Sequence, residues 1–146
     1  MTDETFSEFA PGIGSGAQRP ADWYSIADLP LTILIGVTGV GKSTTLNALA
    51  EIFEFTLLPN RRTLTDHMII APMQLAAGEP ISPVTDRSRR FDYTRRYREA
   101  NPGGMAHALA GTSIDPEKHP GLILFDGLRG VNEVKYAIEA LPLARF

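Results

Sequence analysis

The sequence predicts an α/β fold with a mostly parallel sheet. Apolar runs of strand length alternate with segments of helical spacing, and such alternation is typical of parallel strands joined by helical crossovers. The run over residues 31–35 is almost wholly apolar, as strands covered on both faces usually are. A similar run over residues 121–125 ends at Asp126 and Gly127. We expect a three-layer arrangement with helices on both faces of the sheet.

The 146 residues are enough for one domain with a substantial core. Cysteine is absent, which excludes disulfides, thiolate catalysis and cysteine-bound zinc. No apolar stretch approaches the roughly 20 residues that a membrane span needs, and the polar N-terminus does not resemble a secretory signal. We therefore expect a cytoplasmic protein with no membrane partner. The formal net charge of −3 argues against a nucleic-acid partner.

The N-terminal residues 1–22, rich in glycine, proline, serine and acids, predict a flexible tail before a domain over residues 23–146. Residues 12–16 carry three glycines but follow no predicted strand, so we interpret them as linker. A second strand is predicted over residues 55–58. A fourth strand begins at residues 143–146, so the predicted sheet is incomplete at its C-terminal side.

Helices are expected between these strands. A candidate capping box over residues 63–66 predicts a helix that Pro72 interrupts and Gly78 ends. Polar and apolar spacing predicts two more helices, over residues 87–100 and 105–110. The last helix has an apolar face at helical spacing. The residues of this face are Val131, Val134, Ile138 and Leu141.

The segment after the first strand fits the phosphate-binding pattern G-x-x-x-x-G-K-[ST], with a strand before it and a helix predicted over residues 43–53 after it. Its glycines allow a tight turn in which successive N–H groups converge on a phosphate, and the helix start adds its positive dipole end. The alternative is a glycine-rich turn that happens to carry a lysine. The predicted nucleotide-binding residues are Gly36, Val37, Thr38, Gly39, Val40, Gly41, Lys42, Ser43 and Thr44.

This motif predicts binding of a nucleoside triphosphate, either ATP or GTP, with Mg²⁺. Lys42 would reach the β- and γ-phosphates, and the Ser43 hydroxyl would join a Mg²⁺ shell that is otherwise mostly water. Asp126, at the end of an apolar strand, fits the second Mg²⁺-binding element. The alternative for Asp126 is the start of an Asp-Gly turn.

The residues after Asp126 separate the classes of nucleotide-binding protein. ATPases that activate a water usually have a glutamate next to this aspartate, where this chain has Gly127. Small GTPases place a glycine where this chain has Arg129, and they carry an Asn-Lys-x-Asp guanine reader that is absent here. Both differences argue against a hydrolytic motor and a GTPase.

With these motifs, residues 31–146 resemble the P-loop nucleoside and nucleotide kinase group. Residues 121–129 look like the adenylate-kinase segment in which Asp-Gly follows an apolar strand and an arginine comes next. The family usually has Asp-Gly-aromatic-Pro-Arg, whereas here the proline is absent and Arg129 is one position closer. The loop itself is more similar to that of guanylate-kinase-like enzymes.

The resemblance implies a Mg²⁺-dependent phosphotransferase acting on a small phosphorylated acceptor. It implies catalytic roles for Lys42, Asp126 and Arg129, and Mg²⁺ ligation by Ser43 and Asp126. Arg61, Arg62 and Arg129 would bind the acceptor. The alternative is a P-loop ATPase or a nucleotide-dependent regulatory binding module with little kinase activity.

Such a kinase would have a parallel sheet of about five strands, a mobile acceptor-binding insertion and an arginine-bearing lid. The usual lid position would lie beyond Phe146, so either the chain is truncated or residues 79–104 take this role. Six of the eleven arginines lie between positions 87 and 98. They would either close over the phosphates or form a solvated helix paired with acids. The candidate acids are Asp86, Asp92 and Glu99.

Overall fold

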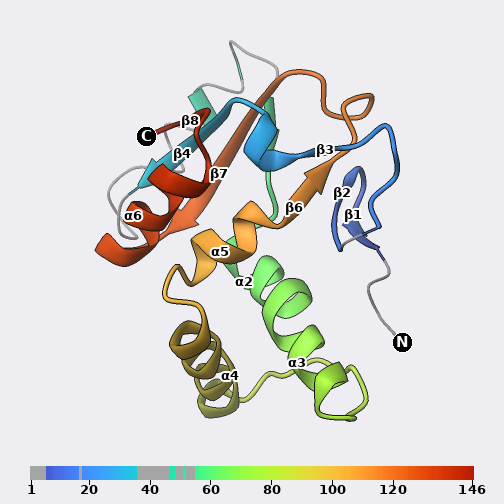
Figure 1. The fold of residues 1–146 in the computed structure, drawn as a ribbon, viewed down its shortest axis with the longest axis vertical. Helices are drawn as coiled ribbons and strands as arrows, with labels where there is room; N and C mark the ends of the chain where they lie inside the picture. Colours follow the sequence, from blue (N-terminus) through green and yellow to red (C-terminus); the bar gives the residue numbers. More distant parts are fainter. Residues whose placement is uncertain (1–5, 17, 36–46, 49–50, 52–54) are drawn as a thin grey trace.

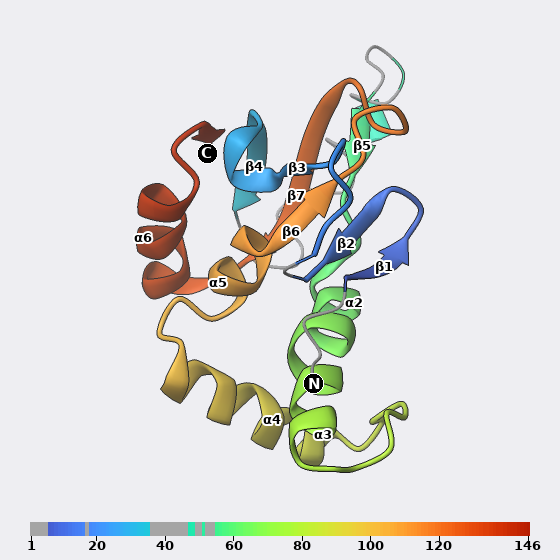
Figure 2. The ribbon, with the colours of Figure 1, turned by 45° about the vertical axis from the view of Figure 1, so that its right-hand side comes forward.

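Two four-stranded sheets, one parallel and one antiparallel, organise the fold (Figure 1). The computed structural model describes residues 6–16, 18–35, 47–48, 51 and 55–146. Figure 1 and Figure 2 show the helices α2, α3 and α4 extending away from the two sheets, whereas α6 lies beside the parallel sheet. The protein is therefore a mixed α/β structure, and the expected parallel sheet is present.

The parallel sheet has the strand order β5-β7-β4-β8, with parallel pairing between all neighbours. All four strands were predicted, including the short one near the end of the chain. The strands are β4 (Leu31–Ile35), β5 (Phe55–Leu57), β7 (Leu122–Leu128) and β8 (Ala144–Arg145). The helix predicted over residues 43–53 lies largely outside the described residues.

β7 runs further than the sequence predicts, through Asp126 and Gly127 to Leu128. Gly127 allows this, because a Cβ there would lie 2.5 Å from the Cζ of the fully buried Phe125. The pairing with β4 shifts register at this point, since Leu34 pairs with Asp126 but Ile35 pairs with Leu128.

The antiparallel sheet corrects the prediction of an entirely flexible N-terminal tail. Residues 7–15 form a hairpin, in which Ile13 pairs with Ile114 and is buried with it. Gly12 supplies the turn with a φ of 73°. The glycines read as linker therefore serve the turn and close packing. The strands, in the order β1-β2-β6-β3, are β1 (Ser7–Ala10), β2 (Ile13–Ser15), β6 (Thr112–Ile114) and β3 (Tyr24–Ser25).

A short 3₁₀ helix, η1 (Ile26–Asp28), follows β3 and brings the fully buried Ile26 into the main core. This core joins residues from both sheets with those of α5. Its most buried side chains include Leu31, Ile33, Leu109, Ile114, Phe125 and Leu128.

The helix after β5 begins earlier than the predicted capping box. Asn60 is its N-cap, and the Asn60 side chain accepts a hydrogen bond from the backbone N–H of Thr63 at 2.9 Å. The predicted break at Pro72 is absorbed by wider π-helical turns in the residues before it. The consecutive segments are α2 (Arg61–Leu64), η2 (Thr65–Ile70) and α3 (Ala71–Ala76).

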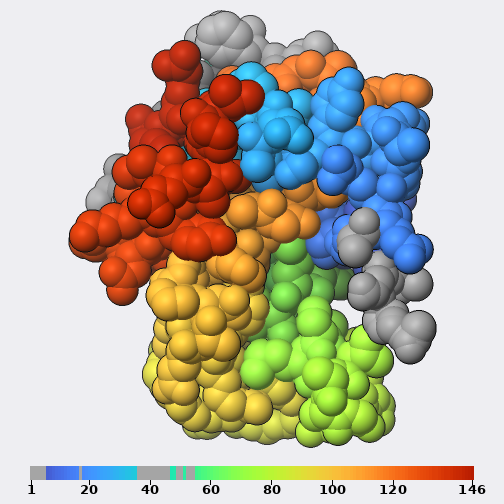
Figure 3. Space-filling view, viewed as in Figure 1, coloured from blue at the N-terminus to red at the C-terminus, as the bar shows by residue number. Residues whose placement is uncertain are grey.

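The helices α4 (Arg87–Ala100) and α5 (Met105–Ala110) have the predicted bounds. Tyr93 of α4 is buried against Ile70 and Val84, which fixes α4 to η2. In Figure 3 the side chains of α3 and α4 form one lobe below the sheets. Whether residues 79–104 act as a lid stays a prediction.

Helix α6 (Gly130–Ala140) is confirmed, and its predicted apolar face is buried only in part. Leu141 is buried and Val134 half-buried, but Val131 and Ile138 are 67% and 57% exposed, whereas Glu133 and Ala137 are buried. The helix turns this side inward because Glu133 binds an arginine across the core boundary, as described below. Among the described residues, no helix is long and apolar enough to cross a membrane.

Candidate functional site

The parallel sheet has a topological switch point between β4 and β7, where the order in which the chain adds strands changes from one side of the sheet to the other. The next parallel strand after β4 is β5, which lies beyond β7, and the next after β7 is β8, which lies beyond β4. In open α/β sheets, ligands bind outside the carboxyl ends of the strands at such a switch point. The pairing of Ile35 with Leu128 marks this edge.

The predicted phosphate-binding residues 36–44, including Lys42 and Ser43, lie outside the described residues. Their position in the sequence is informative, because Gly36 follows directly after the last residue of β4. Asp126 is half-buried and pairs with Leu34, two positions before Gly36. The strand register therefore brings the predicted Mg²⁺-binding carboxylate beside the strand that leads into the motif.

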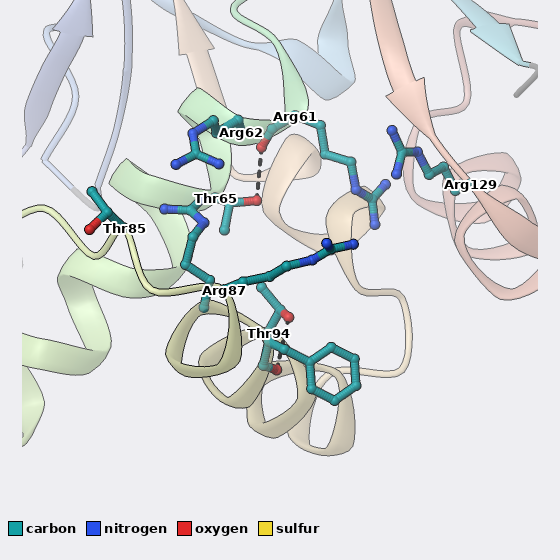
Figure 4. A pocket seen from close by; sticks show the side chains of 9 residues that line it. Arg61, Arg62, Thr65, Thr85, Arg87, Thr94 and Arg129 are labelled. Carbon is teal, nitrogen blue, oxygen red and sulfur yellow. Dashed lines mark hydrogen bonds between the residues drawn. The ribbon is translucent and has the colours of Figure 1, made fainter. Parts of the chain in front are cut away.

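A cavity of about 600 Å³, which we call the arginine pocket, lies near this edge (Figure 4). It brings together the three predicted acceptor-binding residues Arg61, Arg62 and Arg129, although Arg129 is far from the other two in the sequence. Two arginines of the α4 cluster join them. The lining residues are Arg61, Arg62, Thr65, Thr85, Arg87, Arg90, Phe91, Thr94 and Arg129.

Arg61 is held in place by hydrogen bonds on two sides. Its Nη1 donates to the carbonyl oxygen of Gly127 and to Glu133 Oε1 at 2.8 Å, and its Nη2 donates to Glu133 Oε2 at 2.7 Å. A two-point bond of this kind fixes the orientation of a guanidinium as well as its position. Arg61 therefore has a fixed orientation in the pocket lining, and Glu133 balances its charge.

Glu133 collects four hydrogen bonds although it is only 6% exposed. Besides the two from Arg61, it accepts bonds from the backbone N–H of Arg129 at 2.7 Å and of Met105 at 3.3 Å. Burial alone would raise the pKa of Glu133, but the hydrogen bonds and the charge of Arg61 outweigh it, so the pKa lies below its ordinary value. Glu133 is thus a carboxylate that ties α2 to the starts of α5 and α6.

Arg90 is also balanced by a carboxylate. Its Nη1 donates to Asp66 Oδ1 and, at 2.9 Å, to the carbonyl oxygen of Val84. These bonds fasten α4 to η2 and to the loop before α4. The Arg90 side chain is largely buried, so this ion pair is not merely a surface contact.

The other three arginines of the pocket differ. In the described part of the chain, the guanidiniums of Arg62, Arg87 and Arg129 make no ion pair, and all three residues are exposed. In Figure 4 the Arg129 guanidinium points toward that of Arg61, and Arg62 lies at the opposite side of the pocket.

The α4 arginines are divided between an ion-paired outer face and the face that lines the pocket. Arg95 and Arg96 form exposed ion pairs with Asp92 and Glu99, as a solvated helix would. Asp86 instead caps the helix by accepting from the backbone N–H of Arg89. The arginines facing the pocket are Arg87 and Arg90.

A smaller cavity of about 220 Å³ adjoins the arginine pocket and shares Arg61, Thr65, Thr94 and Arg129 with it. Tyr97 lines it, and the Tyr97 hydroxyl lies 2.6 Å from His107 Nδ1. Burial, together with Tyr136, raises the pKa of Tyr97 to about 12, so this hydroxyl keeps its proton at neutral pH. The shared lining shows that the basic cavity continues toward a less charged recess.

Sequence reasoning missed Glu133 as a site residue. One signal was available, because an acid in the first turn of a helix is a usual partner of the N-terminal backbone amides. The choice of Arg87 and Arg90 over the other α4 arginines had no comparable signal, since it depends on how α4 packs against η2. Within the described ranges, no three His, Cys, Asp or Glu side chains gather as a metal-binding set.

Comparison of the chain with protein-family models, with curated proteins and with solved structures finds no match.

Proposed function

We propose that this protein is an ATP-binding, Mg²⁺-dependent phosphotransferase that acts on a small phosphorylated acceptor. Residues 36–44 would hold the phosphates of the donor, with Lys42 at the β- and γ-phosphates. Mg²⁺ keeps most of its water and needs only one or two protein ligands, which Ser43 and Asp126 would supply. GTP is an alternative donor.

The single observation that carries this proposal is the register between β4 and β7. The phosphate-binding pattern begins one residue after β4, and the strand paired with β4 carries Asp126 opposite Leu34. Both elements are at the switch point, where α/β sheets bind their ligands. A glycine-rich turn unrelated to nucleotides would have no reason to share this edge with a carboxylate-bearing strand.

The arginine pocket supports the acceptor half of the proposal. Phosphoryl transfer asks the protein mainly to position two anionic reactants and to neutralise their charge. Arg129 follows β7 directly, so of the pocket arginines it is the one tied most closely to the end of the strand that bears Asp126. We assign Arg129 to the transferred phosphoryl group or the acceptor, and Arg61 and Arg62 to the acceptor.

A second candidate is a P-loop ATPase or a nucleotide-dependent binding module with little turnover. Gly127 favours the module, because a hydrolytic ATPase usually has a glutamate at this position. Gly127 also has a structural role, since its carbonyl oxygen accepts a bond from Arg61.

A coupled assay of ADP release separates these candidates. The full chain is incubated with Mg²⁺ and ATP, alone and with a panel of nucleoside monophosphates and sugar phosphates. Acceptor-stimulated ADP release that Arg129→Gln reduces, and that Lys135→Gln on the exposed side of α6 leaves unchanged, is the expected result. ATP binding without turnover would instead favour the binding module, and equal turnover without any acceptor would favour the ATPase.

A further inference from the structure

We propose that the arginine pocket binds a small ligand carrying two separate phosphate-type groups. This inference extends the acceptor half of the proposed function. It rests on that function only for the claim that the ligand is a substrate.

The charge of the pocket exceeds what one phosphate can balance. Among the described residues, five guanidiniums line it and no carboxylate does. Glu133 balances Arg61 and Asp66 balances Arg90, so three positive charges are left on Arg62, Arg87 and Arg129. One phosphate monoester carries about −1.5 to −2 at pH 7, so two such groups match these charges and one does not.

The guanidiniums are divided between two places. Figure 4 shows Arg62 at one side of the pocket and Arg61 with Arg129 at the other. Each side offers planar donors to an anionic group, which is the arrangement that arginine provides best for phosphate. Because Arg61 is fixed by Glu133, the side with Arg61 and Arg129 has one immobile member and one that is free to turn toward a ligand.

Two of the three threonine hydroxyl groups in the pocket lining are used within the protein. Thr65 Oγ1 donates to the carbonyl oxygen of Arg61 at 2.8 Å, and Thr94 Oγ1 donates to the carbonyl oxygen of Phe91 at 3.1 Å (Figure 4). Anion binding there depends mainly on the arginines, with Thr85 as the third hydroxyl of the lining. Phe91, which is 60% exposed, adds an apolar wall for the part of the ligand between its anionic groups.

The surroundings of the pocket favour a small molecule over nucleic acid. A nucleic-acid surface usually presents a continuous basic stripe along the backbone path. Here the arginines on the outer surface of α4, Arg95 and Arg96, are paired with the acids Asp92 and Glu99. On this face of α4 the basic charge is therefore interrupted by acids rather than continuous.

Calorimetric titration without nucleotide tests the inference. Fructose 1,6-bisphosphate serves as a probe with two separated phosphates, fructose 6-phosphate as its single-phosphate control and pyrophosphate as a probe with adjacent groups. We expect the bisphosphate to bind about tenfold more tightly than either of the others, because one additional charged contact contributes at least that much. Equal affinities for the bisphosphate and the monophosphate would overturn the inference. If pyrophosphate binds as tightly as the bisphosphate, charge alone governs binding and the two-place arrangement is wrong.

Variants locate the binding. Arg62→Gln and Arg129→Gln, one from each side of the pocket, should each weaken bisphosphate binding about tenfold and reduce its advantage over the monophosphate. Arg95→Gln, which removes an exposed arginine of the same helix outside the pocket, should change nothing. An equal loss in Arg95→Gln would show that the pocket is not the site. Circular dichroism of each variant checks that it is folded.

Two further measurements distinguish this inference from the proposed function. Lys42→Ala should keep its bisphosphate binding, because the probe is expected to avoid the donor site; loss of binding would place the probe in the phosphate loop instead. A single-stranded oligonucleotide that binds more tightly than the bisphosphate would overturn the small-molecule assignment. Acceptor-stimulated ADP release with a monophosphate would leave the kinase proposal standing even where two-phosphate selectivity fails.

Discussion

The carboxylate of Glu133 receives two parallel hydrogen bonds from the guanidinium of Arg61, at 2.8 Å from Nη1 to Oε1 and 2.7 Å from Nη2 to Oε2. This pair connects α2, which follows the edge strand β5, with α6, which follows β7. It thereby fixes the wall of the arginine pocket to the carboxyl end of the parallel sheet. The predictions below begin with this pair.

Glu133→Gln should lower the free energy of unfolding by about 2 kcal/mol. The amide keeps the size of the side chain but leaves Arg61 without its counter-charge, and it can accept fewer hydrogen bonds. Urea unfolding followed by circular dichroism measures the change. Glu139→Gln, at an exposed position of the same helix, is the matched control and should fall within about 0.5 kcal/mol of the wild type. Equal losses in the two variants would contradict the assigned role of Glu133.

The stabilisation that the Glu133 charge provides should depend on pH. Because the pKa of Glu133 is lowered in the folded state, the ionised form stabilises the fold above the unfolded value of about 4.3. The contribution is lost as the pH falls through the lower, folded value. The difference in unfolding free energy between wild type and Glu133→Gln should therefore be constant from about pH 6 to 8 and shrink below about pH 4.3. A difference that grows on acidification would reverse the sign and refute the argument.

Gly104→Ala should destabilise the protein more than Gly78→Ala does. Both glycines have a positive φ, of 54° and 75° respectively, so both substitutions introduce backbone strain. A Cβ at Gly104 would also lie 2.9 Å from Glu133 Oε2, whereas nothing lies within 4 Å of one at Gly78. We expect the loss at Gly104 to be about 1–3 kcal/mol and the loss at Gly78 to be at the low end of that range. Thermal unfolding of the two variants makes the comparison, and a larger loss at Gly78 would contradict it.

Gln74→Ala should loosen the loop between α3 and α4. The buried Gln74 side chain donates to the carbonyl oxygen of Ser82 and accepts from its backbone N–H, both at 3.2 Å. Removing it leaves both backbone groups without these partners, at a cost of about 1–3 kcal/mol. Amide hydrogen exchange at Ser82 should accelerate, while the exposed Gln18→Ala variant should exchange as the wild type does. Unchanged exchange at Ser82 would show that the two hydrogen bonds of Gln74 do not hold this loop in place.

The parts of the fold that the sequence predicts are those set by local periodicity. The apolar run of β4 and the spacing of α4 and α5 give their bounds closely because burial and helical period dominate there. The hairpin over residues 7–15 was missed, because its short strands gain their stability from pairing with the distant β6.

The candidate site divides in the same way. The motif over residues 36–44 and Asp126 follow from spacing, whereas the candidacy of Arg61, Arg62 and Arg129 came from the resemblance to nucleotide kinases. The pairing of Glu133 with Arg61 could not be predicted, since helical period gave α6 an apolar face that includes the exposed Val131 and Ile138 and leaves Glu133 out. A buried ion pair overrides that pattern, and only the tertiary arrangement reveals it.

The central claim is that residues 36–44, which follow β4 directly, bind the phosphates of ATP. Equilibrium dialysis of labelled ATP with Mg²⁺ against wild type and Lys42→Ala tests it most directly, with Lys135→Ala on α6 as the control. We expect the wild type and the Lys135 variant to bind alike and the Lys42 variant to lose at least about tenfold in affinity. Equal binding by all three proteins, or none by the wild type, would contradict the account.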